Sequence, residues 1–299
     1  MTPQKAIDGF VAHLRRRGCS EHTRRSYRAD LCGFFDGRES IEVSYPDCRD
    51  WLQRLYESGL AAVSIARKTY SVRSFFDFAK QEGLVSENPA RLLQNRKTPK
   101  LLPKIPSAEA ICRWLDNIRD CAIDRSTGKA RSFSGGRNYL IAELLYASGL
   151  RVDELIGLDL ADIVVGAQTL LIRGKGKKER IGFFGRPAED ALRAYLPLRK
   201  RLLASARKKT DALLLNLEGQ RLTTRSVARL IKELAKNDQV HPHLFRHAFA
   251  THLLEDGMDL ISLGELLGHV SVSTTMRYTH LDMTHMRAAL EKAHPAETF

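Results

Sequence analysis

The segment HPHLFRHAFATHLLEDG, residues 241–257, combines side chains that are suited to binding an anion. His243 and Arg246 are three residues apart, so on a helix they lie on one face. Arginine offers a fork of donors to two oxygens of a phosphate, and histidine can transfer a proton near neutral pH. We therefore expect this pair to bind a phosphate or a similar oxyanion.

A metal site is the alternative for the same segment, because His247 follows His243 by four residues and His252 comes next. The segment lacks the H-E-x-x-H arrangement of zinc enzymes, and a divalent cation beside Arg246 would be repelled. The five cysteines of the chain include no C-x-x-C pair, which disfavours a disulfide framework or a cysteine zinc site. We expect no metal and assign the cysteines no chemistry.

Two further cations lie at element boundaries. Arg151 follows a Ser-Gly-Leu segment at the start of a helix, where a positive charge opposes the helix dipole. Its alternative role is an ion pair with Asp153 or Glu154. Lys175 lies between two glycines in a hairpin turn, and glycines let the backbone approach a ligand closely. The alternative is that Lys175 is simply a solvated lysine in a turn.

Two residues near the C-terminus complete the set of candidates. His269 comes directly after Gly268, where it could simply cap a helix, and Tyr278 in STTMRYTHLD could be a packing aromatic. The glycine-rich GKGKKER lacks the spacing of a nucleotide-binding loop, and no acidic cluster offers a two-metal site. Phosphoryl chemistry here would have to use protein cations in place of Mg²⁺.

The charge of the chain indicates a polyanionic partner, most often nucleic acid. Its 299 residues include 48 Lys and Arg against 35 Asp and Glu, a net charge of +13. The first 100 residues hold 18 basic and 12 acidic residues, so the excess is not confined to one tail. The alternative is a basic surface that is merely solvated. No apolar run could span a membrane and no secretory signal is present, so we expect a cytoplasmic protein.

The elements that must position these residues are mostly helices. The pattern predicts an all-helical domain over residues 1–95, with helices near 7–14, 21–35, 47–58 and 64–83. Residues 96–106 form a basic, proline-rich linker that could follow a phosphate backbone or simply join two domains.

A second domain, of α+β class, begins at residue 107 with Ser107 as a helix N-cap. Residues 124–136 are predicted to form a loop and residues 169–184 an antiparallel hairpin, with a short strand at 213–216. The remaining segments are predicted to be helices at 137–148, from Arg151 onward, and at 187–206, 223–236, 243–256, 259–267 and 273–291. The fold class is mainly α, with one small antiparallel sheet.

Taken in order, these segments resemble the tyrosine recombinases of the phage-integrase type, and among them the XerC and XerD type. ELLYASGLRVDELIGL surrounds Arg151, IRGKGKKERI surrounds Lys175, and LLGHVSVSTTMRYTHLD holds His269 and Tyr278. His269 falls 23 residues after Arg246, and Tyr278 nine residues after His269, as in this family. The resemblance covers nearly the whole chain, although residues 116–136 are longer and more polar than the matching stretch of typical members.

This resemblance implies a core-binding domain over 1–95, a linker over 96–106 and a catalytic domain over 107–299, closing as a clamp on the duplex. It implies that the nucleophile Tyr278 attacks a DNA phosphate, that Arg151 and Arg246 hold its oxygens, and that Lys175 protonates the leaving oxygen. His243 and His269 would position the phosphate and exchange protons with the tyrosine. No metal, ATP or other cofactor is needed.

The partner that the resemblance implies is double-stranded DNA, bound by a homo- or hetero-tetramer on two sites. The C-terminal helix, about 284–292, would dock on a neighbouring subunit, or alternatively within its own chain. The cations expected to contact DNA are Arg24, Arg25, Arg28, Arg67, Lys68, Arg73, Lys97 and Lys100.

The function implied is resolution of chromosome dimers at a dif-like site during chromosome partition and cell division, in the cytoplasm at the nucleoid. A paralogous Xer recombinase and a septal DNA translocase are possible partners. The alternatives are an integrase of a phage or mobile element, a relaxing topoisomerase, and a non-catalytic DNA-binding protein on the same scaffold.

Overall fold

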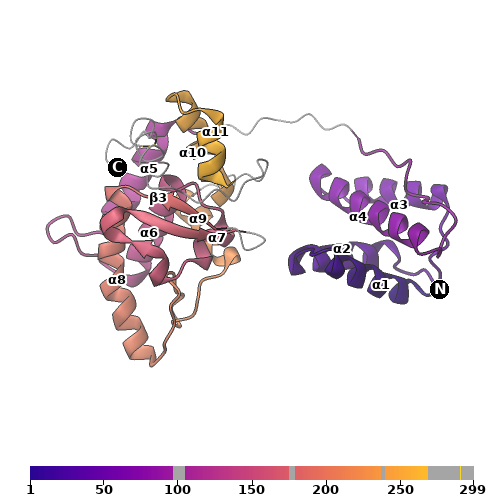
Figure 1. Cartoon of the computed structure of the whole chain (residues 1–299), viewed down its shortest axis with the longest axis horizontal. Helices are drawn as coiled ribbons and strands as arrows, with labels where there is room; N and C mark the ends of the chain where they lie inside the picture. Colours follow the sequence, from indigo (N-terminus) through magenta and orange to yellow (C-terminus); the bar gives the residue numbers. More distant parts are fainter. Residues whose placement is uncertain (97–104, 175–178, 237–239, 269–289, 291–299) are drawn as a thin grey trace. The chain divides into compact units, whose positions relative to one another are not determined.

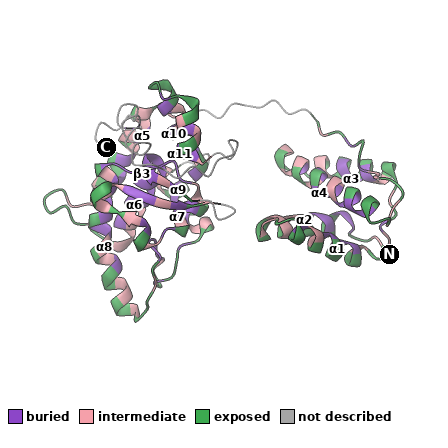
Figure 2. Cartoon of the chain, in the orientation of Figure 1, coloured by how far each residue is buried: buried purple, intermediate pink, exposed green. Residues whose placement is uncertain are grey.

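The computed structural model describes residues 1–96, 105–174, 179–236, 240–268 and 290. The chain divides into two compact units, Met1–Leu102 and Pro103–Phe299. Each unit has its own hydrophobic core (Figures 1 and 2). None of the helices in the described ranges has the length and apolarity needed to cross a bilayer.

Residues 1–96 of the first unit form four helices, as predicted: α1 (Pro3–Arg16), α2 (Glu21–Phe34), α3 (Tyr45–Glu57) and α4 (Ala62–Gln81). Ser20 caps α2 by accepting a hydrogen bond from the Thr23 amide, and Ser44 caps α3 in a capping box with Asp47. Both α3 and α4 begin two residues before the predicted start. In α3 this is because Pro46 fits the first helical turn, where no amide donor is needed.

Aromatic side chains fill the core of the first unit. Phe34 packs edge-on against Trp51, with ring centroids 4.9 Å apart, and Phe35 packs against Phe75 at 5.3 Å. Such edge-to-face pairs stabilise a core beyond the area they bury. They bring α2, α3 and α4 together and leave the polar faces of α2 and α4 exposed.

The described part of the second unit contains the helices α5 (Ala108–Ala122), α6 (Phe133–Ala147), α7 (Val152–Gly157), α8 (Arg186–Ala206), α9 (Thr224–Ala235), α10 (Pro242–Glu255) and α11 (Leu260–Leu267). Two short 3₁₀ helices, η1 (Leu160–Asp162) and η2 (Val165–Ala167), lie between α7 and β2. Helix α6 lies at the centre and contacts α5, α7, α8, α9 and α10.

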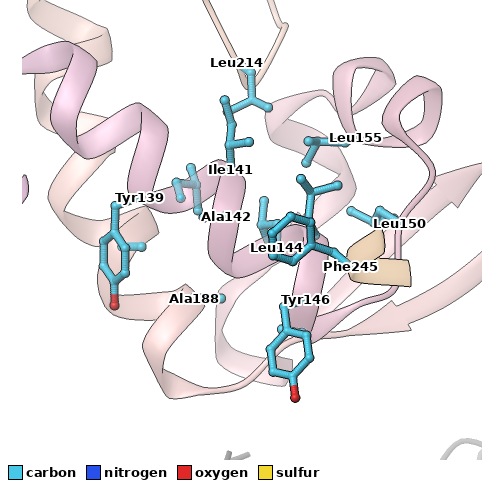
Figure 3. Close-up of a cluster of buried hydrophobic side chains, with 14 of the residues drawn as sticks. Tyr139, Ile141, Ala142, Leu144, Tyr146, Leu150, Leu155, Ala188, Leu214 and Phe245 are labelled. Carbon is cyan, nitrogen blue, oxygen red and sulfur yellow. The ribbon is translucent and has the colours of Figure 1, made fainter. Parts of the chain in front are cut away.

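Apolar side chains point from α6 in several directions, as the central position requires. Figure 3 shows Ile141, Ala142 and Leu144 of α6 among Leu155, Leu214 and Phe245 from other segments. All of these side chains are buried. Every residue from Tyr139 to Ala147 is buried, as expected of a helix that is surrounded on all sides.

The sheet is small and antiparallel, in agreement with the predicted fold class. Strands β2 (Thr169–Arg173) and β3 (Glu179–Phe183) form the predicted hairpin, with Leu171 opposite Ile181. A third strand, β1 (Ile163–Val164), pairs with β2 and was not predicted. Its two residues are too few to show an alternating pattern.

The strand predicted over residues 213–216 is absent. Leu213, Leu214 and Leu215 are fully buried, but they are held by isolated bridges: Asp159 with Ala212, and Leu215 with Arg221. Burial of the segment from all sides, and not membership of a sheet, explains its apolar run.

The loop predicted over residues 124–136 is too long, because α6 begins at Phe133 with Ser132 as its N-cap. Two of the glycines that suggested a loop, Gly135 and Gly136, lie in the first helical turn. At Gly136 a Cβ atom would approach the Ala130 Cβ to 2.8 Å, so close packing explains this glycine. The helix predicted over 273–291 lies outside the described residues, apart from Leu290, which is helical.

Candidate active site

A sharp turn between α6 and α7 presents Arg151. Helix α6 ends at Ala147 with Ser148 as its C-cap, and Gly149 then adopts a left-handed backbone with φ of 55°. A Cβ atom on Gly149 would lie 2.5 Å from Cδ1 of Phe249, so only glycine fits against α10 here. The turn places Arg151 at the N-cap of α7 and directs the Gly149 carbonyl toward α10.

The buried carboxylate of Glu154 is the centre of the site. Its Oε1 accepts a hydrogen bond from Nη1 of Arg151 at 2.8 Å, and its Oε2 accepts from the Arg151 backbone amide at 3.0 Å. The ion pair considered as an alternative for Arg151 is therefore present. It does not bury the guanidinium, because the Arg151 side chain is still 41% exposed. The carboxylate holds this arginine in place while leaving part of it accessible to a ligand.

Arg246 reaches the same carboxylate from α10. Its Nη1 lies 3.9 Å from Glu154 Oε2 and donates to the Gly149 carbonyl at 2.6 Å, and its Nη2 donates to the Leu267 carbonyl at 2.7 Å. Burial, and then the neighbouring charge of Arg151, lower the pKa of Arg246 to about 10. The side chain is therefore cationic at neutral pH. Two arginines 95 positions apart in the sequence thus meet at one carboxylate.

Arg180 is a third arginine at this site, and sequence reasoning missed it. It is buried on β3 and donates from Nη2 to Glu154 Oε2 at 2.8 Å. The segment GKGKKER was considered only for its glycines and for Lys175. The alternation of the hairpin was the available signal, because residue 180 falls on the same face as the buried Gly182.

His243 is exposed on α10, one helical turn before Arg246. Its pKa is lowered from the ordinary value, chiefly by desolvation, with contributions from His241, His247, Arg246 and Arg151. The imidazole is therefore neutral at pH 7 and able to accept a proton.

The arrangement suits an anion. Three guanidinium groups around one carboxylate leave two positive charges in a partly buried space, where electrostatic interactions are stronger than in water. No group of three His, Cys, Asp or Glu residues that could hold a metal occurs within the described ranges. The site can bind and polarise a phosphate group with its own cations.

Three of the six candidates, Lys175, His269 and Tyr278, lie outside the described residues. Strand β2 ends at Arg173 and β3 begins at Glu179, so Lys175 belongs to the connection between them. Gly268 precedes His269 and ends α11 in a left-handed conformation. A Cβ on Gly268 would lie 2.9 Å from Cδ of Arg180.

Several of the cations predicted to contact DNA lie on α2 and α4 of the first unit. Asp30, buried on α2, pairs with Arg67 and with Lys68 of α4, and accepts a hydrogen bond from Ser71. Arg28 of α2 pairs with Asp8 of α1 at 2.6 Å. The side chains of Arg28 and Arg67 remain nearly half exposed, so each can contact another anion in addition to its carboxylate partner.

The other predicted DNA contacts differ in surroundings. Arg24 and Arg25 share Glu21, and Arg25 is the more exposed of the two. Arg73 is half-buried and donates from Nε to the Ala90 carbonyl at 3.2 Å, which fixes the turn after α4. Lys97 and Lys100 lie outside the described residues.

The C-terminal segment contributes Leu290 to the core of its own chain. Leu290 is fully buried in a cluster with residues of β3, α10 and α11, among them Phe183, Phe249 and Leu266. Docking of the C-terminal helix, about 284–292, on a neighbouring subunit stays a prediction.

Comparison with known proteins places the chain among relatives with the same architecture. The phage integrase family matches residues 126–285, and the N-terminal SAM-like domain of phage integrases matches residues 7–83. A tyrosine recombinase XerC of Thermodesulfovibrio yellowstonii is 36% identical, over 97% of this chain and 96% of the relative. Another XerC, of Mycobacterium sp. (strain KMS), is 38% identical, over 98% and 99%.

Solved structures show the same fold. A lambda integrase fragment bound to a core site aligns with a TM-score of 0.66 at 16% identity, covering 93% of this chain and all of that one. A XerH recombinase bound to its difH substrate aligns with a TM-score of 0.65 at 21% identity, covering 94% and 83%.

The family matches, the full-length similarity to XerC relatives and the fold agree with one another. The chain belongs to the phage integrase family and is a tyrosine recombinase by descent.

Proposed function

We propose that the protein is a site-specific recombinase that cuts and rejoins double-stranded DNA through a 3′-phosphotyrosine intermediate. The observation that carries this proposal is the meeting of Arg151 and Arg246 at Glu154, from two helices far apart in sequence. Such a pair matches the two non-bridging oxygens of a phosphodiester.

The arginines act on the charge that grows in the transition state. Attack on phosphorus adds negative charge to the non-bridging oxygens, and preorganised cations stabilise this charge without reorganising. Arg246 is held by two backbone carbonyls and Arg151 by a carboxylate, so both are in place before DNA binds.

The remaining candidates supply the bond exchange. The phenolic oxygen of Tyr278 attacks phosphorus, its proton passes to His243 or His269, and the bond from phosphorus to the 5′ oxygen breaks. Lys175 gives its proton to that oxygen, leaving a free 5′-hydroxyl. Attack by the 5′-hydroxyl of the partner strand then restores a phosphodiester and releases Tyr278, with no cofactor consumed.

The assembly we propose is a tetramer on two DNA sites, with the first unit and the basic linker also contacting the duplex. Similarity to XerC proteins over nearly the full length of both chains supports a role in resolving chromosome dimers at a dif-like site. A paralogous recombinase and a septal translocase are the further partners of this proposal, and the cytoplasm is its location.

Covalent trapping tests the proposal. A nicked duplex carrying the dif-like site of the source organism is incubated with the protein in EDTA and without ATP. We expect a DNA adduct that resists SDS with the wild type and none with Tyr278→Phe, which keeps DNA binding. If the wild type alone gives no adduct, the reaction is repeated with the paralogous recombinase. Failure of the pair while binding persists would favour the non-catalytic alternative.

The arginine pair is tested in the same assay. Arg151→Ala and Arg246→Ala should slow adduct formation by about 100-fold or more, as expected when a transition-state donor is lost, and should weaken DNA binding much less. Arg193→Ala is the matched control, because Arg193 is an exposed arginine paired with Glu189 on α8. Normal cleavage by either site variant would overturn the assigned phosphate clamp.

A further inference from the structure

Arg180 lies beside the groups that hold the two arginines of the proposed phosphate clamp. Its Nη2 donates to Glu154 Oε2, the carboxylate that holds Arg151. Its Cδ and Nε lie against Gly268, the residue after Leu267, whose carbonyl accepts a hydrogen bond from Arg246. Arg180 therefore contacts one group that fixes the clamp, the Glu154 carboxylate, and lies beside the residue that follows the other, Leu267.

The close contact with Gly268 explains why glycine is needed there. A Cβ atom would come within 2.9 Å of Cδ and 3.0 Å of Nε of Arg180, and the residue has a φ of 65°. Helix α11 thus ends directly on the Arg180 side chain. If that side chain were shortened or moved, both the carboxylate and the end of α11 could shift.

The charge balance of the cluster points the same way. Glu154 is buried, and a buried carboxylate needs partners that offset the loss of hydration. Arg180 is almost as buried as Glu154 and supplies one of these partners from a strand. Without it the carboxylate would draw more strongly on Arg151 and Arg246, the two side chains that are to face the phosphate.

We propose that Arg180 is a positioning residue, which holds Glu154 and the end of α11 so that Arg151 and Arg246 face the scissile phosphate. This role rests on the proposed function. Arg180 acts through other residues and does not itself touch the DNA.

The test compares two duplexes that differ only at the scissile position, one with the native phosphate and one with a methylphosphonate. The methyl group removes the negative charge that the clamp binds. All proteins carry Tyr278→Phe, so that binding is measured without cleavage. The quantity of interest is the ratio of the two dissociation constants within each variant. A variant that is partly unfolded changes both constants equally, so its ratio is unaffected.

We expect native DNA to bind about tenfold more tightly or better when Arg180 is intact, the usual range for a hydrogen bond to a charged group. The ratio should fall toward one in Arg180→Met and to an intermediate value in Arg180→Lys, which keeps the charge but not the fork. Arg173→Met is the control: Arg173 lies on the same hairpin and pairs with Asp162 and Glu179, away from Glu154. It should keep the full ratio.

The outcomes separate the two proposals. A ratio that is unchanged in both Arg180 variants would overturn the positioning role and leave the proposed function intact. A ratio near one with Arg180 intact would overturn the charged phosphate clamp itself, and the positioning role with it. An equal fall in Arg173→Met would show that any damage to the hairpin has this effect, which also overturns the specific role of Arg180.

Discussion

At the scale of single residues, the site shows why an ion pair and a ligand-binding role are compatible for the same arginine. A guanidinium has five donors, and Glu154 uses only one edge of Arg151. The carboxylate restricts the arginine to one conformation, which lowers the entropy lost when an anion binds. From the sequence alone, the choice between an Arg151–Glu154 pair and a phosphate clamp looked exclusive. In the structure the ion pair leaves the Arg151 side chain 41% exposed, so the pair is compatible with the proposed clamp.

The pH dependence of cleavage tests His243. Its pKa is lowered below the ordinary 6.5 by desolvation and by surrounding cations, so the imidazole is neutral at pH 7 and becomes protonated only in more acidic solution. The rate of adduct formation in single-turnover reactions should therefore stay level from pH 8 to about 6.5 and fall below that. His243→Gln should lose this fall and be slower by about 100-fold or more at pH 7.

Two results would contradict the role of His243. An acidic fall that starts well above pH 6.5 would show that the pKa is raised and not lowered. A fall that persists unchanged in His243→Gln would belong to another group. His13→Gln, on α1 of the first unit, is the control histidine and should leave the profile unaltered.

At the scale of elements, the parts with a clear period could be predicted from the sequence, and the parts fixed by tertiary contacts could not. The β2–β3 hairpin and the amphipathic helices follow from alternation and from 3.6-residue spacing. The segment Leu213–Leu215 shares its apolar composition with a strand, but contacts from all sides decide its conformation. The same limit applies to the site. Helical spacing was enough to pair His243 with Arg246. Arg180 reaches Glu154 only because the fold brings β3 next to α7, which the local sequence does not show.

The turn between α6 and α7 gives a stability prediction at this scale. Gly149→Ala combines a left-handed backbone with a contact of 2.5 Å to Phe249, so we expect a loss of about 2 to 5 kcal/mol in the free energy of unfolding. Gly157→Ala is the matched control, because its Cβ meets nothing within 4 Å. It should be neutral or slightly stabilising. Urea unfolding followed by circular dichroism measures both, and an equal effect of the two substitutions would contradict the assigned tightness of the turn.

At the scale of the whole molecule, the net charge of +13 is divided between both units, so we expect the position of each cation to decide whether it contacts DNA. Asp30 and Asp8 neutralise part of the charge of α2 and α4, yet Arg25, Arg28 and Arg67 stay exposed at these helices. Arg125, Arg193 and Arg229 of the second unit are 65 to 76% exposed, and they likewise pair with nearby carboxylates. The two sets of arginines have the same charge, but one lies on α2 and α4 of the first unit and the other lies in the second unit.

Salt titration of DNA binding distinguishes an effect of where the arginines lie from an effect of the net charge. Each phosphate contact releases condensed counterions and adds about 0.9 to the slope of log K against log salt. Neutralising Arg25, Arg28 and Arg67 together, as Arg→Gln changes, should lower this slope by about 2 to 3 if all three contact phosphates. The matched triple variant at Arg125, Arg193 and Arg229 removes the same charge and should leave the slope nearly unchanged. Equal losses in both variants would mean that DNA responds to net charge alone, and the assignment of a DNA-binding face to α2 and α4 would be wrong.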